Sequence, residues 1–288
     1  MLEAVDRIQL VVTDRAATVE IWRALFDAEV VGEDESAVLG AKRTTVRAGV
    51  SEIEFLEPSA PGRISRFSAA WRQGLYGAGF STPDLGAMAR HLEREGVSWR
   101  EEGGRLYLSE ESTHGMPTVL TQRTIHQAAG NVLAHIYEVT NPVTNAKTTT
   151  AHYARIFGLA AARFSPIASK LYGYEGTLTL FDPPARLDRV EVTQTHGGGA
   201  MDRFFQRRGA SLYMCYAETD DVPTLAARLR ARGARFTDSE DRPPETGLFI
   251  HPSALDGMLM GISRTSYAWV WSGRPELAGA GAESYRAH

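Results

Sequence analysis

The sequence predicts an α+β protein of two domains, each built from two βαβββ modules. The first observation behind this prediction is an internal repeat. The segment Ile53–Phe55 precedes Val190–Val192 by 137 positions (190 − 53 = 137), and the same shift brings Arg66-Phe67 onto Arg203-Phe204. An offset that stays constant over such a length indicates a duplicated fold unit. The second observation is the order of the expected elements, which repeats four times along the chain.

In the first half, each quarter is expected to contain a strand, a helix and about three further strands. Residues 6–12 alternate between polar and apolar side chains and include β-branched residues, which predicts a strand. Thr13-Asp14 then offers a cap for an amphipathic helix over 15–29. Pro83-Asp84 begins a second long helix that stops at Gly96. The remaining expected elements are a helix over 64–71 and strands near 44–47, 52–56, 75–81, 97–101, 105–109 and 118–122.

The second half repeats this order after a polar connection over 123–130. We expect a strand over 131–139, a helix from Asn145 that ends at Gly158, a short helix after the glycine run at 197–199, and a longer one that ends at Gly233. Further strands are expected near 162–164, 168–174, 177–182, 189–193, 248–250 and 258–263. The predicted domains are therefore 1–125, expected to be structural, and 130–265, expected to carry the active site.

The last segment, 266–288, is expected to be a partly disordered tail, because it becomes rich in Gly, Ala and polar residues. Its Trp269 and Trp271 would contact the body of the protein or a partner subunit, so a homodimer is one expected state.

Composition places the chain among ordinary globular proteins. Its 288 residues are 43% hydrophobic and 23% charged, with a net charge of −4. That charge gives no basic field for nucleic acid, and no basic run suggests a membrane surface. A single cysteine, Cys215, fits a reducing compartment, and it is expected to be a buried small hydrophobe. With no signal-peptide pattern at the start, we expect a cytoplasmic protein that acts on a small molecule.

Three stretches resemble methylmalonyl-CoA epimerase-like modules: Glu52–Pro58 followed by Ser65–Phe67, then Asp220–Gly233, and finally Phe249–Pro252. The order of all pieces over about residues 4–265 is similar to the vicinal oxygen chelate superfamily, which includes glyoxalase, bleomycin resistance proteins and extradiol dioxygenases. The resemblance implies that each half bends its two modules into one cupped mixed sheet. It also implies that up to four strand side chains could converge on one divalent metal ion in a cup.

The positions that the resemblance assigns to metal ligands carry few ligand side chains. They are Arg7, Glu54, Gly77 and Val119 in the first half, and His135, Glu191, Met214 and Gly261 in the second. In the first half only Glu54 can bind a metal, so we expect Arg7 to replace the ion and to pair with Glu54. Gly77 and Gly79 are expected to make room in that cup.

In the second half, His135 and Glu191 are the candidate catalytic residues, and three interpretations stay open. Glu191 could orient His135 as a general acid or base. The two side chains could form two legs of a weak site for one divalent metal ion. They could also be a structural relic. The candidate substrate-binding residues are Tyr213, Met214, Tyr216, His196 and His251.

The run Thr195–Gly199 opens a helix, so its backbone N–H groups could hold an anion, although a glycine run is also typical of a plain turn.

The functional hypothesis is an enzyme that performs proton-transfer isomerisation or lyase chemistry on a small oxygenated metabolite, with a degenerate metal site. The alternative is a non-catalytic binder of the antibiotic-sequestering type, whose cup would be lined by aromatic residues and glycines. Extradiol ring cleavage is a third hypothesis, and it would require two histidines and one glutamate around iron, of which His135 supplies one.

Overall fold

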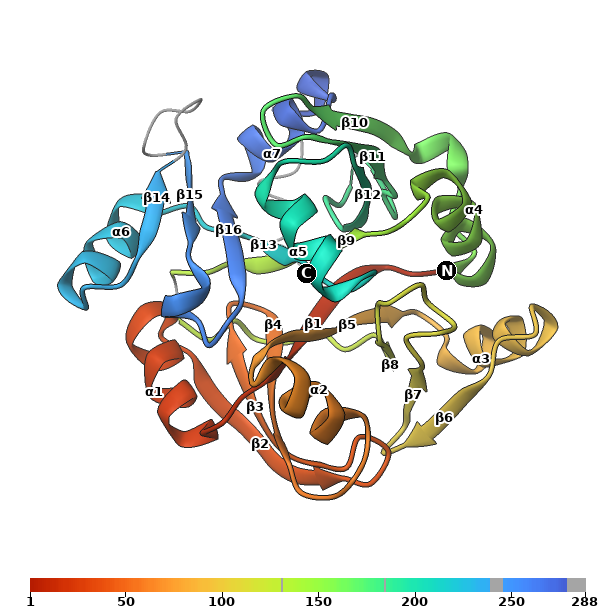
Figure 1. The fold of residues 1–288 in the computed structure, drawn as a ribbon, viewed down its shortest axis with the longest axis horizontal. Coiled ribbons are helices and arrows are strands. Elements are labelled where there is room, and N and C mark those ends of the chain that lie inside the picture. Colours follow the sequence, from red (N-terminus) through yellow and green to blue (C-terminus); the bar gives the residue numbers. More distant parts are fainter. Residues whose placement is uncertain (131, 184, 239–245, 279–288) are drawn as a thin grey trace.

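The protein consists of two eight-stranded mixed sheets, one from each half of the chain (Figure 1). The computed structural model describes residues 1–130, 132–183, 185–238 and 246–278. The strands of the first sheet lie within residues 4–122, and those of the second lie within residues 135–263. The fold class expected from the sequence, α+β with paired βαβββ modules, is confirmed.

The first sheet has the strand order β2-β3-β4-β1-β5-β8-β7-β6. In each module of this half the first and last strands pair in parallel, as β1–β4 and β5–β8. The antiparallel pair β1–β5 joins the two modules into one sheet. Its strands are β1 (Ala4–Val11), β2 (Glu29–Ser36), β3 (Ala41–Ala48), β4 (Ser51–Pro58), β5 (Gly74–Thr82), β6 (Trp99–Glu102), β7 (Arg105–Leu108) and β8 (Thr118–Gln122).

The second sheet repeats this arrangement in the order β10-β11-β12-β9-β13-β16-β15-β14. The corresponding parallel pairs are β9–β12 and β13–β16, with β9–β13 antiparallel between the modules. Its strands are β9 (His135–Pro142), β10 (Ser165–Ser169), β11 (Tyr174–Leu178), β12 (Arg189–Thr195), β13 (Met214–Glu218), β14 (Phe236–Asp238), β15 (Gly247–Ile250) and β16 (Leu259–Ser263).

Each module carries one helix between its first and second strand, and a shorter helix joins the two modules of a half. The module helices are α1 (Arg15–Phe26), α3 (Leu85–Arg94), α4 (Ala146–Phe157) and α6 (Val222–Ala231), and the joining helices are α2 (Arg63–Trp71) and α5 (Ala200–Arg208). The module helices begin at an Asp or Asn whose side chain accepts a backbone N–H three residues later, which is the usual N-cap. The other helical segments are η1 (Ala161–Arg163), η2 (Pro252–Ala254), α7 (Thr265–Trp271) and η3 (Pro275–Leu277).

The two halves share one contiguous hydrophobic core. Helix α1 contacts α6, and α3 contacts α4, so each pair lies side by side at one end of the molecule (Figure 1). Phe80 of the first sheet packs its ring 5.9 Å from Phe157 and 5.7 Å from Phe181 of the second half. A hydrogen bond of 2.7 Å from the Val5 N–H to Asp188 Oδ1 also joins the halves. The halves therefore hold each other in a fixed orientation.

The 137-residue repeat is present in the structure as β4 and β12, α2 and α5, β5 and β13, and α3 and α6. Several local expectations differ from the structure. The strands expected near 168–174 and 177–182 are displaced, because residues 170–173 form the turn between β10 and β11. The edge strand β2 was not expected, because seven of its eight residues are exposed and it lacks an apolar face. The short edge strand β14 was not expected either. Residues 162–164 were expected to form a strand, but most of them lie in the 3₁₀ turn η1, in which no residue is buried.

The first part of the segment expected as a partly disordered tail is ordered, because residues 265–277 form α7 and η3. Trp269 is fully buried, and the Trp271 ring lies 4.9 Å from Tyr216 of the second sheet. These tryptophans therefore contact the body of their own chain, whereas residues 279–288 lie outside the described residues. In the part of the chain that the structure describes, the helices are too short or too polar to cross a membrane.

The docking of α7 predicts that Trp269→Ala lowers the free energy of unfolding by about 3–5 kcal/mol, because it removes a large buried ring and leaves a cavity. Urea denaturation measures this change. Val270→Ala is the matched control, since the neighbouring Val270 is 46% exposed and its truncation is expected to change stability by less than about 0.5 kcal/mol. Equal effects of the two variants would contradict the docking of α7.

Candidate ligand-binding cup

Each sheet has one face in the shared core and one face that forms a cup. In β4, Ile53 and Phe55 belong to the core, and in β12 Val190 and Val192 do so. Alternate strand residues point to opposite faces, so Glu54 of β4 and Glu191 of β12 point into the two cups. We call these the N-terminal cup and the C-terminal cup. Glu54 and Glu191 occupy equivalent positions, 137 residues apart.

The N-terminal cup is filled by a buried ionic cluster around Glu54. Glu54 Oε1 accepts hydrogen bonds from Arg7 at 2.8 Å and from Arg105 at 2.5 Å. Glu54 Oε2 accepts one from Gln9 Nε2 at 2.8 Å, and Arg43 lies 3.7 Å away. Burial alone would raise the pKa of Glu54, but Arg7, Arg105 and Arg43 outweigh it and lower the pKa to about 2. The pairing of Arg7 with Glu54 expected from the sequence is therefore present.

Glycine makes this packing possible on β5. A Cβ atom on Gly79 would lie 2.0 Å from Arg7 Cγ, and one on Gly77 would lie 2.5 Å from Gln9 Oε1. Both contacts are far too short for a side chain, as expected for residues that make room in the cup.

The C-terminal cup has lost the arginines that close the N-terminal one. Arg43 pairs with Leu56 in the first sheet. The residue equivalent to Leu56 in the second sheet is Thr193, and it pairs with Gly176, so a glycine replaces Arg43. The position equivalent to Arg105 is Gly247. Each lies two residues before an aromatic residue, Tyr107 or Phe249, that pairs with the equivalent strand position, Val119 or Gly261. Glycines therefore stand at both positions, and the space above Glu191 stays open.

A buried cross-strand ion pair occurs at the same register in both halves, with its charges exchanged. In the first half Arg7 of β1 lies opposite Glu52 of β4, with an N–O distance of 2.9 Å. In the second half Glu138 of β9 lies opposite Arg189 of β12, and Arg189 Nε donates to Glu138 Oε2 at 2.5 Å. Glu138 and Arg189 are fully buried. The cation thus lies on the first strand in one half and on the last strand in the other.

The open part of the C-terminal cup is a cavity of about 430 Å³. Aromatic rings form much of its wall: Tyr216 lies 5.9 Å from Phe249 and 4.9 Å from Trp271 between ring centroids. Glu191 is the carboxylic acid that lines this cavity among the described residues. The lining residues are Ile167, Ala168, Ser169, Tyr172, Tyr174, Glu191, Ala200, Met201, Tyr213, Met214, Tyr216, Thr237, Phe249, His251, Leu259 and Trp271.

Glu191 is held as a weak acid. Its Oε2 accepts a hydrogen bond from Thr140 Oγ1 at 2.6 Å. Burial, and then the nearby Glu138 carboxylate, raise the pKa of Glu191 to about 8, while Thr140, Arg189 and the Tyr174 phenol lower it in part. A group with this pKa exchanges its proton near neutral pH, which suits general acid–base chemistry.

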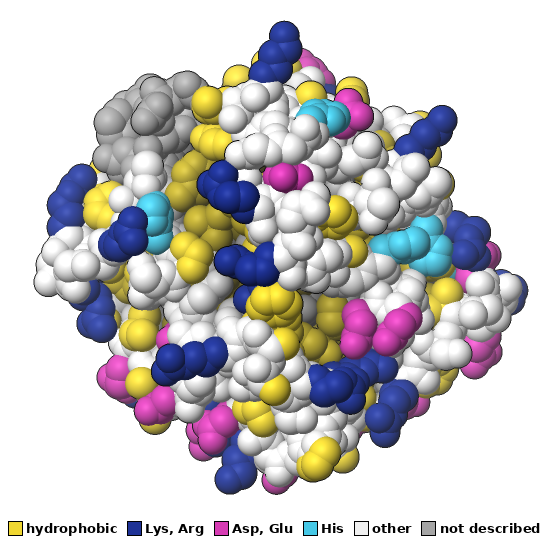
Figure 2. All heavy atoms as spheres, viewed as in Figure 1, with side chains coloured by type: hydrophobic (Ala, Val, Ile, Leu, Met, Phe, Trp, Pro, Cys, Tyr) yellow, Lys and Arg dark blue, Asp and Glu magenta, His cyan; other side chains and the backbone are white. Residues whose placement is uncertain are grey.

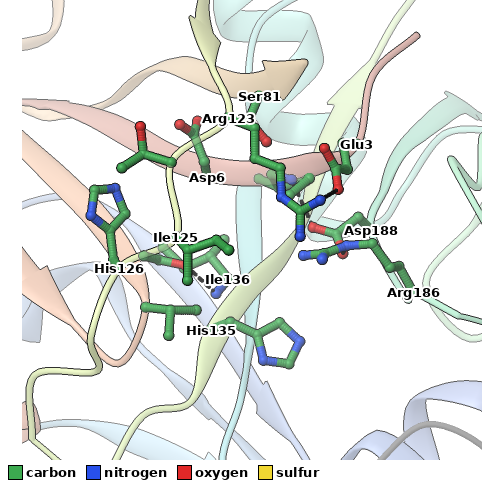
Figure 3. Close-up of a pocket in the computed structure, with 15 residues that line it drawn as sticks. Glu3, Asp6, Ser81, Arg123, Ile125, His126, His135, Ile136, Arg186 and Asp188 are labelled. Atoms are coloured by element: carbon green, nitrogen blue, oxygen red, sulfur yellow. Dashed lines mark hydrogen bonds and ion pairs between the residues drawn. The ribbon is translucent and has the colours of Figure 1, made fainter. Parts of the chain in front are cut away.

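His135, the other predicted catalytic residue, does not meet Glu191. It lies at the start of β9, whereas Glu191 faces Thr140 of that strand, five residues or about 17 Å further along. Figure 3 shows His135 with Glu3, Arg186 and Asp188 around a separate cavity of about 70 Å³ between the halves. Its Nε2 lies 3.4 Å from Glu218 Oε2.

Burial, and then Arg186, lower the pKa of His135 to about 3, so its ring is neutral at pH 7. The structure therefore does not assemble the predicted His135–Glu191 dyad or a two-legged metal site from these residues.

The predicted substrate-binding residues divide between the cup and the surface. Tyr213, Met214, Tyr216 and His251 line the cavity, and His251 Nε2 lies 2.6 Å from Thr237 Oγ1 at the rim. His196 lies outside the cavity, where its half-exposed ring is 3.7 Å from Glu175.

The glycine run before α5 already has an anion from its own helix. Asp202 accepts hydrogen bonds from Thr195 Oγ1 at 2.8 Å and from the Gly198 N–H at 3.2 Å. The carboxylate satisfies part of the helix N-terminus, so the run acts as a capped turn.

The residues around Glu191 do not fit a divalent metal ion. Thr140 lies opposite Glu191, Met214 lies opposite Thr140, and Gly261 lies opposite Tyr216. A hydroxyl, a thioether and a glycine form no set of hard ligands. Glu138 is already bound to Arg189, whose fixed positive charge repels a cation. Among the described residues, no group of three His, Cys, Asp or Glu side chains could hold a metal ion.

Sequence reasoning missed the Glu138–Arg189 pair because the repeat offset changes within a half. Arg7 and Glu138 are 131 positions apart, whereas Glu52 and Arg189 are 137 apart. The alignment of Arg7 with His135 was therefore wrong by three residues, because the residue equivalent to Arg7 is Glu138. The register between β9 and β13 also shifts between Tyr216 and Ala217. This irregularity interrupts the alternation of side chains between the two faces of the sheet, from which the face of His135 would otherwise follow. The charges could have indicated the correct alignment, because each half has one arginine and one glutamate at this pair of positions: Arg7 with Glu52, and Arg189 with Glu138.

Comparison with solved structures shows a similar fold over most of the chain. A triple mutant of 4-hydroxymandelate synthase from Streptomyces coelicolor superposes with a TM-score of 0.71 over 92% of this chain and 93% of that chain, at 11% identity. Methylmalonyl-CoA epimerase from Streptomyces coelicolor matches 43% of this chain and 100% of its own at 24% identity, with a TM-score of 0.39. The epimerase from Mycobacterium tuberculosis matches 43% of this chain and 89% of its own at 17% identity, also with a TM-score of 0.39.

No protein-family model and no curated protein sequence matches the chain. The superposition over 92% of the chain shows that it shares its fold with 4-hydroxymandelate synthase, which agrees with the paired βαβββ modules expected from the sequence.

The opposite environments of Glu191 and Glu54 predict opposite effects of removing their charges. The folded-state pKa of Glu191 is raised above that of the unfolded chain, so its contribution to stability is complete below pH 4.5 and is lost as pH rises through about 8. Glu191→Gln should therefore match the wild type at pH 4 and exceed its stability by roughly 2–4 kcal/mol at pH 9.

Glu54 is the matched control. Its folded-state pKa is lowered, so its stabilising contribution is present above pH 4.5 and is lost as pH falls towards 2. Glu54→Gln should destabilise the protein at pH 7 by about 3–5 kcal/mol, because the buried Arg7 and Arg43 and the partly buried Arg105 lose the carboxylate that they share. Urea denaturation at pH 4, 7 and 9 measures both variants, and an equal pH dependence of the two would contradict the assigned environments.

The exchanged ion pair predicts a compensating double variant. Arg189→Glu alone should lower the free energy of unfolding by about 3–5 kcal/mol, since it places two carboxylates opposite each other in a buried site. Adding Glu138→Arg recreates the order of charges in the first half and should restore a large part of the loss. A double-mutant cycle by urea denaturation gives the coupling energy. Additive losses would show that the two residues do not form a pair.

Proposed function

We propose that the protein is an enzyme that binds a small oxygenated molecule in the C-terminal cup and moves a proton on it, with Glu191 as the acid–base group. The observation that carries this proposal is the contrast between equivalent positions: Glu54 is sealed under arginines, whereas Glu191 faces an open cavity lined by aromatic residues. The N-terminal half then serves as a structural support, and the C-terminal half carries the site.

The chemistry of the cup supports proton transfer, as in isomerisation or lyase reactions. In its ionised form Glu191 can accept a proton from a carbon next to a carbonyl group, and in its protonated form it can return one. Thr140 donates a hydrogen bond to the Oε2 atom and so fixes the carboxyl group, which lines the cavity where a ligand would lie. The aromatic wall would hold an apolar part of the substrate. No step of this proposal uses a metal ion.

A non-catalytic binding protein is the second candidate, and the aromatic wall favours it. Tyr213, Tyr216, Phe249 and Trp271 would hold a flat molecule without any chemical step. Extradiol ring cleavage receives no support, because two histidines do not accompany Glu191 in the cup. Within the described residues, the terminal tryptophans give no support to a homodimer either, since they pack on their own chain.

The test combines binding with hydrogen exchange. Small aromatic and aliphatic carbonyl compounds are first screened for thermal stabilisation of the protein. Each compound that binds is then incubated in D₂O, and deuterium uptake next to its carbonyl is followed by NMR. We expect the wild type to catalyse exchange, and Glu191→Gln to slow it by about 10²–10⁴-fold while it binds with similar affinity.

Met214→Arg tests the location of the site. Met214 lies opposite Thr140, so an arginine there would reach Glu191 and fill the cup as Arg7 and Arg105 fill the other one. This variant should lose binding and exchange. Val31→Arg is the control, because Val31 is 40% exposed on the first sheet. Saturable binding without exchange would support the non-catalytic candidate, and equal exchange by Glu191→Gln would overturn the proposed role of Glu191.

A further inference from the structure

A second cavity, of about 370 Å³, lies between the two halves and shares no lining residue with the cavity of the C-terminal cup. It is formed by α2 of the first half, by the end of α5 of the second half, and by the segment 110–117. We call it the interface pocket. Figure 2 shows that apolar and basic side chains gather between the halves on the face that carries α2 and α5. The pocket is built from repeated positions, because Trp71 and Arg208, which meet there, are 137 residues apart.

Arg208 is held rigidly in this pocket by aromatic rings. Its guanidinium carbon lies 4.7 Å from the ring centroid of Trp71, 5.1 Å from that of Phe204 and 5.5 Å from that of Phe67. Stacking of this kind occupies the faces of the guanidinium and leaves its N–H edge available. In the part of the chain that the structure describes, no carboxylate or carbonyl accepts from Arg208, and its Nε is buried without a partner.

Tyr76 supplies a second buried donor without a partner. Its side chain lines the pocket and the residue is only 6% exposed, yet its hydroxyl makes no hydrogen bond to the described residues. Leaving such a group unpaired is unfavourable. The Phe67–Tyr76 rings pack edge-on with their centroids 5.5 Å apart, and the equivalent rings in the second half, Phe204 and Tyr213, pack in the same way at 5.1 Å.

The charge around the pocket favours an anion. Three arginines and two glutamates line it, which gives a net charge of +1 (3 − 2 = 1). Glu110 lies 3.8 Å from Arg63, so its charge is partly matched. Arg66 and Arg208 form no ion pair with any described residue. The pocket is also well defined on one side, because a Cβ atom on Gly115 would lie only 2.0 Å from the Ala210 carbonyl oxygen.

From these contacts we infer that the interface pocket is a second ligand site, which takes a small carboxylate with an apolar body. The carboxylate accepts from the N–H edge of Arg208 and from the Tyr76 hydroxyl, and the apolar body lies against Phe67, Trp71 and Leu75. The site is distinct from the C-terminal cup, and this inference does not depend on the proposed acid–base role of Glu191.

Benzoate titrated against the full-length protein tests this inference, with isothermal titration calorimetry as the readout. Arg208→Gln should weaken benzoate binding about tenfold or more, because a charge-assisted hydrogen bond is lost. Tyr76→Phe should weaken it several-fold. Arg207→Gln is the matched control, since Arg207 is the neighbouring, exposed arginine of α5 and does not line the pocket.

Two further measurements separate this site from the cup and from plain apolar binding. Met214→Arg, which fills the cup, should leave the affinity for benzoate unchanged. Benzamide, which has the same shape without the charge, should bind about tenfold more weakly than benzoate. Loss of benzoate binding in Met214→Arg, unchanged binding in both Arg208→Gln and Tyr76→Phe, or the absence of saturable benzoate binding to the wild type would each overturn the inference.

Discussion

A buried ion pair between the first and the last strand of a βαβββ module is the constraint on which both cups depend. Burial of a charge is costly unless an opposite charge and hydrogen bonds satisfy it. Each half meets this requirement at the same register, with Arg7 and Glu52 in one and Glu138 and Arg189 in the other. The order of the two charges decides the environment of the neighbouring glutamate, because Glu54 then lies beside a cation on β1, whereas Glu191 lies near a carboxylate on β9.

This exchange explains why one cup is closed and the other is open. Around Glu54, Arg7, Arg43 and Arg105 form a network that excludes a ligand and keeps the carboxylate ionised. Around Glu191, Gly176 and Gly247 stand where two of those arginines would be, and the aromatic rings of Tyr216, Phe249 and Trp271 line the space. The two copies therefore differ in their cups: one is filled by a buried ionic network, and the other is a hollow with a weakly acidic carboxyl group.

Much of the fold could be predicted from the sequence, because the repeat and the apolar periodicity are local signals. The repeat located the strand that carries Glu191 and the aromatic wall at Tyr213 and Tyr216. The edge strand β2 escaped prediction, since its pairing with β3 rather than an apolar face defines it. The pairing of His135 with Glu191 failed for a related reason. The offset between the halves is 131 at β1 and β9 and rises to 137 at β4 and β12, so the 137-residue repeat does not align the first strands. Aligning Arg7 with His135 instead of Glu138 is an error of three residues, which moves a side chain about 10 Å along a strand.

The sequence by itself determined the duplication, the βαβββ order and the presence of a glutamate at equivalent cup positions, because these depend on spacing and side-chain type. Only the tertiary structure decided which charges meet: that Arg189 holds Glu138, that α7 returns to place Trp271 over the C-terminal cup, and that Trp71 and Arg208 face each other between the halves. These contacts join residues far apart in the chain, and their formation depends on strand register and on the docking of the two halves, which no local pattern encodes.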